Sequence, residues 1–329
     1  MKKLTIIFTV LLLLLLTGCG AKQSTGEKEK LKVINIAIQQ SLTPLLLAKE
    51  KGWFEEEFKK AGIQVKWTEF QSGPPQFEGV SAGKIDFAGV GNSPVIAAQS
   101  AGIGFKELSV YQDGLKGNAI LVNKDSKIKS ISDLKGKKVA VAKGSSGFDF
   151  LYKAMDQAGL KPDDVQVIQL QPDEAKPAFD SGSVDAWSIW EPFISIETIN
   201  NEAKVLANGE SLDNIYSPAF FLVRSDFSDQ HPKETVQFLK VIQKAVAFQK
   251  EHRDEVVDIY AKAKKLDKKV VESVLDNTGA TNDPVTDEII KAQQETADFQ
   301  YKIGAIKKKI DVKEVVDNTF IDEALKSSK

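Results

Sequence analysis

Four short polar junctions are the segments of this sequence best suited to chemistry, because each separates an apolar run from a helical pattern. They occupy residues 39–44, 71–75, 91–94 and 143–147 and are rich in Ser, Thr, Asn, Gln, Gly and Pro. The first backbone N–H groups of a helix lack partners inside the helix, and the helix dipole is positive at that end. Helix starts therefore bind anions without a charged side chain. Several such starts at one sheet edge indicate a site for a small oxyanion.

An anion bound at these junctions cannot be held by an arginine cluster. The chain has 44 basic and 46 acidic residues, a formal net charge of -2, and its only arginines are Arg224 and Arg253. This balance also argues against a nucleic-acid partner, which requires a basic stripe. Helix starts and neutral donors are therefore the favoured means of binding an anion. The hydroxyl pair Ser145 and Ser146 is the best candidate, because neighbouring glycines allow close backbone approach.

Each junction taken alone also has a purely structural explanation. Ser, Thr and Asn are preferred N-caps of any helix. The shortage of arginine favours ligand contact for the set as a whole, provided that the ligand is anionic. Two glycines belong to the candidate site, Gly73 in the second junction and Gly147 in the fourth.

A second candidate feature is the segment Asp-Ala-Trp-Ser-Ile-Trp-Glu-Pro at residues 185–192. Tryptophan supplies apolar surface and one N–H donor, so Trp187 or Trp190 could pack against an alkyl chain at the end of a strand. Alternation along a strand places the two on opposite faces, which predicts that one of them belongs to the core. Glu191 could bind an amine, hold a neighbouring side chain or cap a turn.

Catalytic and metal-binding patterns are poor throughout the chain. The only histidines are His231 and His252, and the only cysteine is Cys19. The sequence has no nucleophile elbow, phosphate loop or dinucleotide fingerprint. We therefore expect a binding protein with no catalytic residues, no cofactor and no metal, and not an enzyme.

The elements that must position the junctions follow a repeating strand-helix order. This order is typical of doubly wound α/β domains, and a chain of 329 residues is expected to form more than one domain. Strands at residues 118–122 and 220–223 are expected to lead to a second unit and back. The predicted strands are residues 31–39, 65–71, 85–90, 137–142, 165–170 and 184–189, and the helices between them are residues 43–51, 74–82, 94–101, 146–158 and 172–181. A helical tail is predicted over residues 234–252, 254–266, 268–277, 287–306 and 312–327.

The first residues have the pattern of an export signal: two lysines, an apolar run over residues 4–16, then Thr17 and Gly18. The run is shorter than the roughly 20 residues that span a membrane. Leu-Thr-Gly-Cys at residues 16–19 resembles the lipobox of bacterial lipoproteins, which implies cleavage before Cys19 and its lipidation. Residues 20–30 are expected to form a flexible tether. The mature protein would then lie at the extracytoplasmic face of the cell membrane.

Four motifs together resemble the solute-binding proteins of ABC importers for aliphatic sulfonates, taurine and nitrate. They are Lys-Gly-Trp-Phe-Glu at residues 51–55, Gly-Lys-Ile-Asp-Phe-Ala-Gly-Val-Gly at residues 83–91, Ile-Ser-Asp-Leu-Lys-Gly-Lys-Lys-Val-Ala at residues 131–140 and Gly-Ser-Val-Asp-Ala-Trp at residues 182–187. The aliphatic-sulfonate branch is the most similar, on residues 71–75 and 144–146. The nitrate branch tends to carry a histidine in its site, and no histidine lies at the junctions here.

The resemblance implies a two-lobed α/β fold of the periplasmic-binding-protein kind (type II, Venus flytrap) with a helical C-terminal region. It implies that a monomer captures a small anionic ligand, an alkanesulfonate, between the lobes and delivers it to a permease and an ATPase. The expected divisions are a signal at residues 1–18, a lipidated tether at 19–30, a first lobe at 31–121 and 217–329, and a second lobe at 122–216. By the same resemblance the cleft residues are Gln40, Ser41, Thr43, Asn92, Ser93, Ser145, Ser146 and Trp187.

Two alternatives remain open at this point. The same scaffold could carry taurine, nitrate or a thiamine-type pyrimidine. The second alternative is a secreted enzyme related to pyrimidine synthases, which would need histidine chemistry that the junctions lack. If the chain is a binding protein, for a sulfonate or for another ligand, closure is expected to rotate the lobes about hinges near residues 121–122 and 216–219.

Overall fold

The first apolar strand is buried and paired in parallel on both sides, as its sequence predicts. In the computed structural model, which describes residues 30–112, 114–213 and 215–326, Ile34 and Ile36 of β1 (Val33–Ile38) are fully buried. The sheet has the order β2-β1-β3-β10-β4, and β10 runs antiparallel to both of its neighbours. Its other strands are β2 (Gln64–Glu69), β3 (Phe87–Gly91), β4 (Phe105–Gln112) and β10 (Ala219–Arg224).

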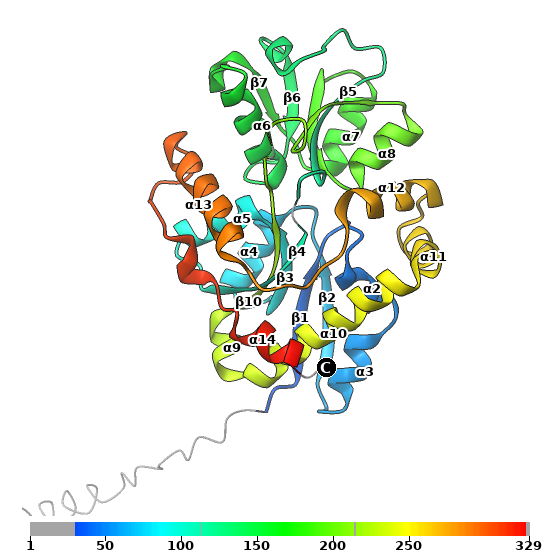
Figure 1. The fold of residues 1–329 in the computed structure, drawn as a ribbon, viewed down its shortest axis with the longest axis vertical. Helices are drawn as coiled ribbons and strands as arrows, with labels where there is room; N and C mark the ends of the chain where they lie inside the picture. Colours follow the sequence, from blue (N-terminus) through cyan, green and yellow to red (C-terminus); the bar gives the residue numbers. More distant parts are fainter. Residues whose placement is uncertain (1–29, 113, 214, 327–329) are drawn as a thin grey trace, which may run out of the picture. The chain divides into compact units, whose positions relative to one another are not determined.

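A second sheet repeats this arrangement with strands from the middle of the chain. Its order is β7-β6-β8-β5-β9, and β5 runs antiparallel to β8 and β9. Its strands are β5 (Asn118–Val122), β6 (Lys138–Val141), β7 (Gln166–Gln169), β8 (Ala186–Trp190) and β9 (Lys204–Asn208). We call the first sheet with its helices the first lobe and the second sheet with its helices the second lobe. Figure 1 shows the second lobe in green above the first, and the predicted two-lobed α/β fold is confirmed.

Helices cover both faces of each sheet, which explains why the central strands are apolar on both sides. In the second lobe, Phe150 and Leu151 pack on one face while Phe179 and Trp187 pack in a separate cluster. The first lobe contains α2 (Pro44–Glu50), α3 (Trp53–Lys59), α4 (Gly73–Ser81), α5 (Asn92–Ser100) and α9 (Ser225–Gln230). The second lobe contains η1 (Ile131–Leu134), α6 (Ser146–Gln157), η2 (Pro162–Asp164), α7 (Pro172–Asp180) and α8 (Phe193–Asn200).

The C-terminal region is helical, as predicted, with one exception. Its elements are α10 (Pro232–Glu251), α11 (Arg253–Lys264), α12 (Lys268–Thr278), α13 (Asp287–Lys302), η3 (Val312–Val315) and α14 (Thr319–Lys326). The single helix expected over residues 312–327 is broken between η3 and α14. The Val285 N–H donates to Asn318 Oδ1 (2.9 Å), and Asn318 Nδ2 donates to the Val285 carbonyl (2.9 Å). This long-range pairing fixes Asn318 against the segment before α13, at the break between η3 and α14.

The chain passes from one lobe to the other between β4 and β5 and returns between β9 and β10. The two crossings touch, because a Cβ added to Gly114 (φ +77°) would lie 1.8 Å from the Ser217 carbonyl oxygen. The expected boundary at residue 121 lies too late in the chain, since Asn118 already pairs with Trp190 in the second sheet. The hinge expected at residues 121–122 likewise lies inside a strand that is paired on both sides.

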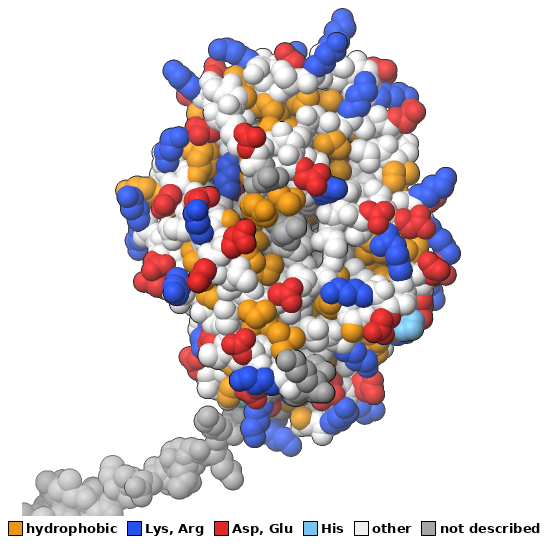
Figure 2. All heavy atoms as spheres, in the orientation of Figure 1, with side chains coloured by type: hydrophobic (Ala, Val, Ile, Leu, Met, Phe, Trp, Pro, Cys, Tyr) orange, Lys and Arg blue, Asp and Glu red, His pale blue; other side chains and the backbone are white. Residues whose placement is uncertain are grey.

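The surface carries charges of both signs side by side. Figure 2 shows blue and red side chains interspersed over the visible face. In the part of the chain that the structure describes, no helix is both long and apolar enough to cross a membrane. The predicted signal, Cys19 and the tether up to residue 29 lie outside the described residues.

Glu107 of β4 is the buried carboxyl with the clearest energetic consequence. It is 1% exposed, and its hydrogen-bond donor is Gln293 Nε2 (2.9 Å) on α13. Burial raises the pKa of this carboxyl to about 8, and the hydrogen bond from Gln293 only partly offsets that effect. The folded state therefore holds a proton that the unfolded chain releases above its ordinary pKa of 4.5. Stability is lost as pH rises from about 4.5 toward about 8.

We expect Glu107→Gln to stabilise the protein in a pH-dependent way. The gain should be about 3 kcal/mol at pH 7 and under about 1 kcal/mol at pH 5, because each unit of differential titration is worth about 1.4 kcal/mol. Urea unfolding of both proteins at several pH values measures this difference. An equal gain at pH 5 and pH 7 would contradict the prediction, since it would show that titration of this carboxyl does not contribute.

Candidate ligand-binding site

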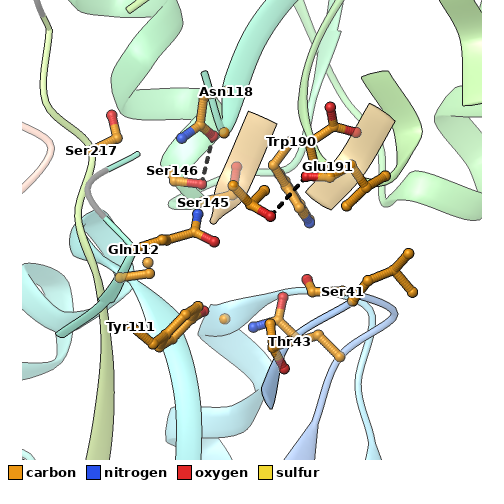
Figure 3. A pocket seen from close by; sticks show the side chains of 18 of the residues that line it. Ser41, Thr43, Tyr111, Gln112, Asn118, Ser145, Ser146, Trp190, Glu191 and Ser217 are labelled. Atoms are coloured by element: carbon orange, nitrogen blue, oxygen red, sulfur yellow. Dashed lines mark hydrogen bonds between the residues drawn. The ribbon is translucent and has the colours of Figure 1, made fainter. Parts of the chain in front are cut away.

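The two lobes and α12 together line a partly open cavity of about 40 Å³. It lies where β3, β4 and β8 end and where α5 and α6 begin, which is the edge of a parallel sheet that usually binds ligands. Figure 3 shows Asn118 and Ser146 on its second-lobe side and Ser41 and Thr43 on its first-lobe side. The lining residues are Gln39, Ser41, Leu42, Thr43, Gly73, Gly91, Pro94, Tyr111, Gln112, Gly117, Asn118, Ser145, Ser146, Trp190, Glu191, Ser217, Ala219, Val274 and Thr278.

The starts of α5 and α6 approach one another across this cavity. Gly91 is the N-cap of α5, and a Cβ added to it would lie 3.1 Å from Ser146 Cβ at the start of α6. The N-cap of α6 is Ser145. The first backbone N–H groups of both helices lack intrahelical partners, and both dipoles are positive here. A small anion between them would therefore meet two helix starts from opposite lobes.

Hydroxyl and amide groups surround these helix starts. Ser146 Oγ donates to Asn118 Oδ1 (2.8 Å), which leaves the Asn118 Nδ2 hydrogens free of this bond. The Ser217 hydroxyl is 1% exposed, lines the cavity and has no hydrogen-bond partner among the described residues. Thr43 is the N-cap of α2, yet its side chain makes no capping hydrogen bond. These groups can donate to an anion in the cavity without breaking secondary structure.

Tyr111 and Trp190 give the cavity aromatic walls with polar tips. Burial raises the pKa of the Tyr111 hydroxyl well above its usual range, so this group stays protonated and can donate a hydrogen bond. The Tyr111 ring packs against Phe221 with ring centroids 4.6 Å apart. In Figure 3 the Trp190 indole lies between the second-lobe and first-lobe residues. One ligand could therefore make both polar and apolar contacts here.

Among the described residues that line the cavity, Glu191 is the only one with a charged side chain, and its carboxylate is already hydrogen-bonded within the protein. Glu191 Oε2 accepts from the Ser195 N–H (3.0 Å), and Oε1 accepts from Ser195 Oγ (2.9 Å) and Asn277 Nδ2 (2.7 Å). Burial raises the pKa of Glu191, and these hydrogen bonds partly oppose the change. Both arginines are engaged elsewhere, Arg224 with Asp86 and Asp226 and Arg253 with Asp276. An anion would be held by neutral donors alone.

Seven of the twelve candidates predicted from sequence line this cavity. They are Ser41, Thr43, Gly73, Ser145, Ser146, Trp190 and Glu191. Ser145 contributes differently from the prediction, because its hydroxyl is occupied in the helix cap. Its Oγ accepts from the Phe148 N–H (3.2 Å) and donates to the Ala142 carbonyl (2.7 Å). Ser145 therefore shapes the start of α6, while Ser146 presents its hydroxyl to the cavity.

Two of the candidates, Gln40 and Trp187, do not line the cavity, and a nearby residue of the same type lines it in place of each. Gln40 is exposed, and its neighbour Gln39 takes the cavity position. Trp187 is fully buried between Phe179 and Phe193 in the core of the second lobe, and Trp190 lines the cavity instead. The prediction that one of the two tryptophans is a core residue is confirmed.

Asn92, Ser93 and Gly147 lie beside the cavity and do not line it. Ser93 Oγ donates to the Gly144 carbonyl of the second lobe (3.3 Å) and accepts from Gln300 Nε2 (2.9 Å), so it joins the lobes. A Cβ on Gly147 would lie 3.0 Å from the Ser188 carbonyl oxygen, which shows that this glycine lets α6 pack on β8. The Asn92 side chain is fully buried and has no partner among the described residues.

The lining residues that sequence reasoning missed come mainly from the crossings and the C-terminal helices. Gln112, Gly117 and Ser217 lie next to the two crossings, and Val274 and Thr278 lie on α12. One local signal could have indicated Gln112 as a site residue: it lies two positions before Gly114, and glycine often marks a turn. No local pattern indicated the residues of α12. Among the described residues, no group of three or more His, Cys, Asp and Glu is placed to hold a metal ion.

Comparison with known proteins places these features in one family. The model of the NMT1/THI5-like family matches residues 39–256. A protein of Bacillus subtilis (strain 168) that is named as an aliphatic sulfonates-binding protein is 64% identical over 320 residues, 97% of this chain and 96% of that protein.

Two solved structures share the fold over most of their length. The alkanesulfonate-binding protein SsuA from Xanthomonas axonopodis pv. citri bound to MOPS is 32% identical with a TM-score of 0.81, over 87% of this chain and 98% of that one. The periplasmic aliphatic sulphonate binding protein SsuA from Escherichia coli is 33% identical with a TM-score of 0.76, over 87% and 92%. These relatives confirm the resemblance stated from the motifs, and the chain belongs to the NMT1/THI5-like family.

Proposed function

We propose that this protein is the substrate-binding component of an ABC importer and that it captures aliphatic sulfonates between its two lobes. The observation that carries the proposal is the cavity between the starts of α5 and α6, which is rich in neutral donors and has no Lys, Arg or His among its described lining residues. A sulfonate is ionised at every physiological pH and only accepts hydrogen bonds. Neutral donors and helix dipoles therefore suit its head, and Trp190 suits its alkyl part.

The position of Glu191 favours a simple sulfonate over taurine. An ammonium group such as that of taurine makes its strongest hydrogen bonds with an acceptor of opposite charge. Both Glu191 oxygens already accept hydrogen bonds from Ser195 and Asn277. No other carboxylate lines the cavity within the described part of the chain. We therefore infer that the protein acts as a binding protein for uncharged-tail sulfonates and not as an enzyme.

Isothermal titration calorimetry with the soluble protein tests the proposal. Methanesulfonate and ethanesulfonate are expected to bind, while nitrate, taurine and a hydroxymethylpyrimidine are expected to bind at least about 10-fold more weakly, a difference of about 1.4 kcal/mol. Tighter binding of taurine would overturn the assignment in favour of the taurine alternative. Observed conversion of any of these compounds would be needed to support an enzyme.

The membrane location and the transport partners belong to the same proposal. We infer that lipid on Cys19 holds a monomeric receptor near its permease and ATPase, which raises its effective concentration at the membrane. Incorporation of labelled palmitate into the full chain, absent in Cys19→Ser, would support the anchor. A soluble form that lacks residues 1–18 and carries Cys19→Ser should still bind ligand, and loss of binding would show a wider role for the anchor.

A further inference from the structure

Helix α13 is attached to the first lobe by apolar contacts. Ala297 packs with Ile96 of α5, and Ile290 packs against the core of the first lobe. Gln293 on the same helix donates to the buried Glu107 of β4 (2.9 Å). Figure 1 shows α13 in orange beside α5. Because the exposure of apolar surface to water is unfavourable, we expect α13 to stay with the first lobe when the lobes move apart.

The contacts between α13 and the second lobe are polar instead. Lys153 Nζ of α6 donates to Thr296 Oγ1 (2.6 Å), and Gln300 Nε2 donates to Asp149 Oδ1 of α6 (3.3 Å). Gln300 Nε2 also donates to Ser93 Oγ (2.9 Å) at the start of α5, so this one side chain contacts both lobes. We call Asp149, Lys153, Thr296 and Gln300 the α6–α13 cluster.

The α6–α13 cluster contains a buried ion pair whose neutral partners come from the other lobe. Asp149 is 1% exposed, and Lys153 Nζ lies 3.0 Å from its Oδ2. Both charged residues lie on α6, whereas Thr296 and Gln300 lie on α13. A buried charged group that lacks a hydrogen-bond partner is destabilised, but water supplies that partner once the group is exposed. The hydrogen bonds from α13 therefore stabilise the arrangement in which the lobes touch.

The boundary between α6 and α13 is also open to water at its edge. A partly open groove beside the cluster is lined by Asp156 and Gln157 of α6 and by Glu295 and Phe299 of α13. At this edge Lys302 Nζ pairs with Asp156 Oδ1 (3.1 Å), an exposed contact that contributes little. Water can thus hydrate the polar groups as the two helices separate. A polar boundary of this kind is typical of domains that move relative to one another.

We propose that the α6–α13 cluster is a latch that holds the two lobes in contact and thereby sets the affinity for a ligand that it does not touch. None of its four residues is among the described residues that line the cavity, so they are positioning residues. The inference rests on the proposed function in placing the ligand between the lobes. Such a ligand binds while the lobes are in contact, and its apparent affinity falls in proportion to the population of that arrangement.

Thr296→Val tests the latch with little change of side-chain shape. It removes the acceptor of the Lys153 ammonium group, which is partly exposed, so calorimetric affinities for methanesulfonate and ethanesulfonate should both fall by about 3- to 10-fold. Thr235→Val is the matched control and should keep the wild-type affinities. Both threonines are fully buried, and each donates to the carbonyl four residues earlier (3.0 Å). Thr296 in addition accepts a hydrogen bond from the second lobe.

Two further variants test the contacts themselves. Gln300→Met should weaken both sulfonates by about 10- to 30-fold, because it removes two donations, one of them to a buried carboxylate. In a Lys153→Met background, Thr296→Val should change the affinity by less than about 2-fold, since the two residues act through one contact. Additive effects would contradict that coupling. Thermal unfolding of each variant shows that it is folded.

Spin labels report the arrangement of the lobes without any ligand. The soluble form with Cys19→Ser has no cysteine, so labels can be attached at Glu78→Cys on α4 and Ser183→Cys after α7. Both positions are exposed, and they lie in different lobes. Pulsed dipolar spectroscopy should show a short separation in the otherwise wild-type protein. Thr296→Val and Gln300→Met should shift the labels to longer separations, and Thr235→Val should not.

The outcomes separate the latch from the proposed function. Wild-type affinities and label separations in Thr296→Val and Gln300→Met would overturn the latch and leave sulfonate binding intact. A change in the preference between methanesulfonate and ethanesulfonate by more than about 3-fold would also overturn it, because the variants would then act on the cavity itself. Binding of neither sulfonate to wild type would overturn the proposed function, and the label separations would still decide whether the latch exists.

Discussion

Gly91→Val should weaken methanesulfonate binding by at least about 100-fold, equivalent to about 3 kcal/mol, while the protein stays folded. Gly91 lines the cavity and adopts φ -74° and ψ 171°, which valine also adopts without strain. A Cβ at this position would lie 3.1 Å from Ser146 Cβ and 3.4 Å from Ser146 Oγ, with no other neighbour within 4 Å. The clash is therefore confined to the opposite lobe. Separation of the lobes relieves it, and separation also removes the site.

The stability cost of the same change should be small. Valine is a poorer N-cap than glycine, which costs about 1 kcal/mol. Gly104→Val is a suitable control, because the nearest atom to its Cβ would be Ser225 Oγ at 3.6 Å, an ordinary contact outside the cavity. Calorimetry measures the affinity, and small-angle scattering measures whether ligand still makes the protein more compact. Wild-type affinity in Gly91→Val would show that the ligand does not bind between these helix starts.

Asn118→Asp should weaken sulfonate binding by at least about 1000-fold, because juxtaposed like charges cost several kcal/mol. The two side chains have nearly the same shape. Asn118 Oδ1 accepts from Ser146 Oγ (2.8 Å), and an aspartate can accept the same bond. The replacement exchanges the Nδ2 donor for a negatively charged oxygen at a position that lines the cavity. Both effects oppose an anion in that space.

A graded variant and a charge control complete this test. Ser217→Ala removes a buried hydroxyl that has no partner among the described residues, and loss of one hydrogen bond to a charged ligand costs about 1.5–3 kcal/mol, or roughly 10- to 100-fold. Asn200→Asp adds the same charge at an exposed position outside the cavity and should leave the affinity unchanged. If Asn118→Asp binds methanesulfonate as wild type does, the anion lies elsewhere.

The fold was largely predictable from the sequence because its signals are local. Apolar runs such as that around Ile34 and Ile36 need burial on both faces, and the alternation of strands with helices then requires a parallel sheet. The start of α6 was predictable as well, since Ser145 caps it through the Phe148 N–H. The break between η3 and α14 was not predictable, because Asn318 pairs with the distant Val285.

The sequence by itself determined which chemistry was available at the site. With two arginines and several polar helix starts, the chain could not bind an anion through an arginine cluster, and neutral donors at helix starts were the favoured alternative. Tertiary structure decided which members of each candidate group face the ligand. Gln39 took the place of Gln40, and Trp190 took that of Trp187, because a shift by an odd number of positions along an extended chain moves a side chain to the other face.

Only the tertiary structure could bring Ser217 and α12 to the cavity. Ser217 follows β9 by several residues, and Val274 and Thr278 lie on a helix with no polar junction of its own. Their positions depend on contacts between residues far apart in the chain, such as Asn277 with Glu191. Such contacts leave no local pattern, because each partner alone looks like an ordinary helix or turn residue. The kind of ligand was therefore readable from the sequence, whereas the contribution of α12 to the site depends on how the C-terminal helices pack.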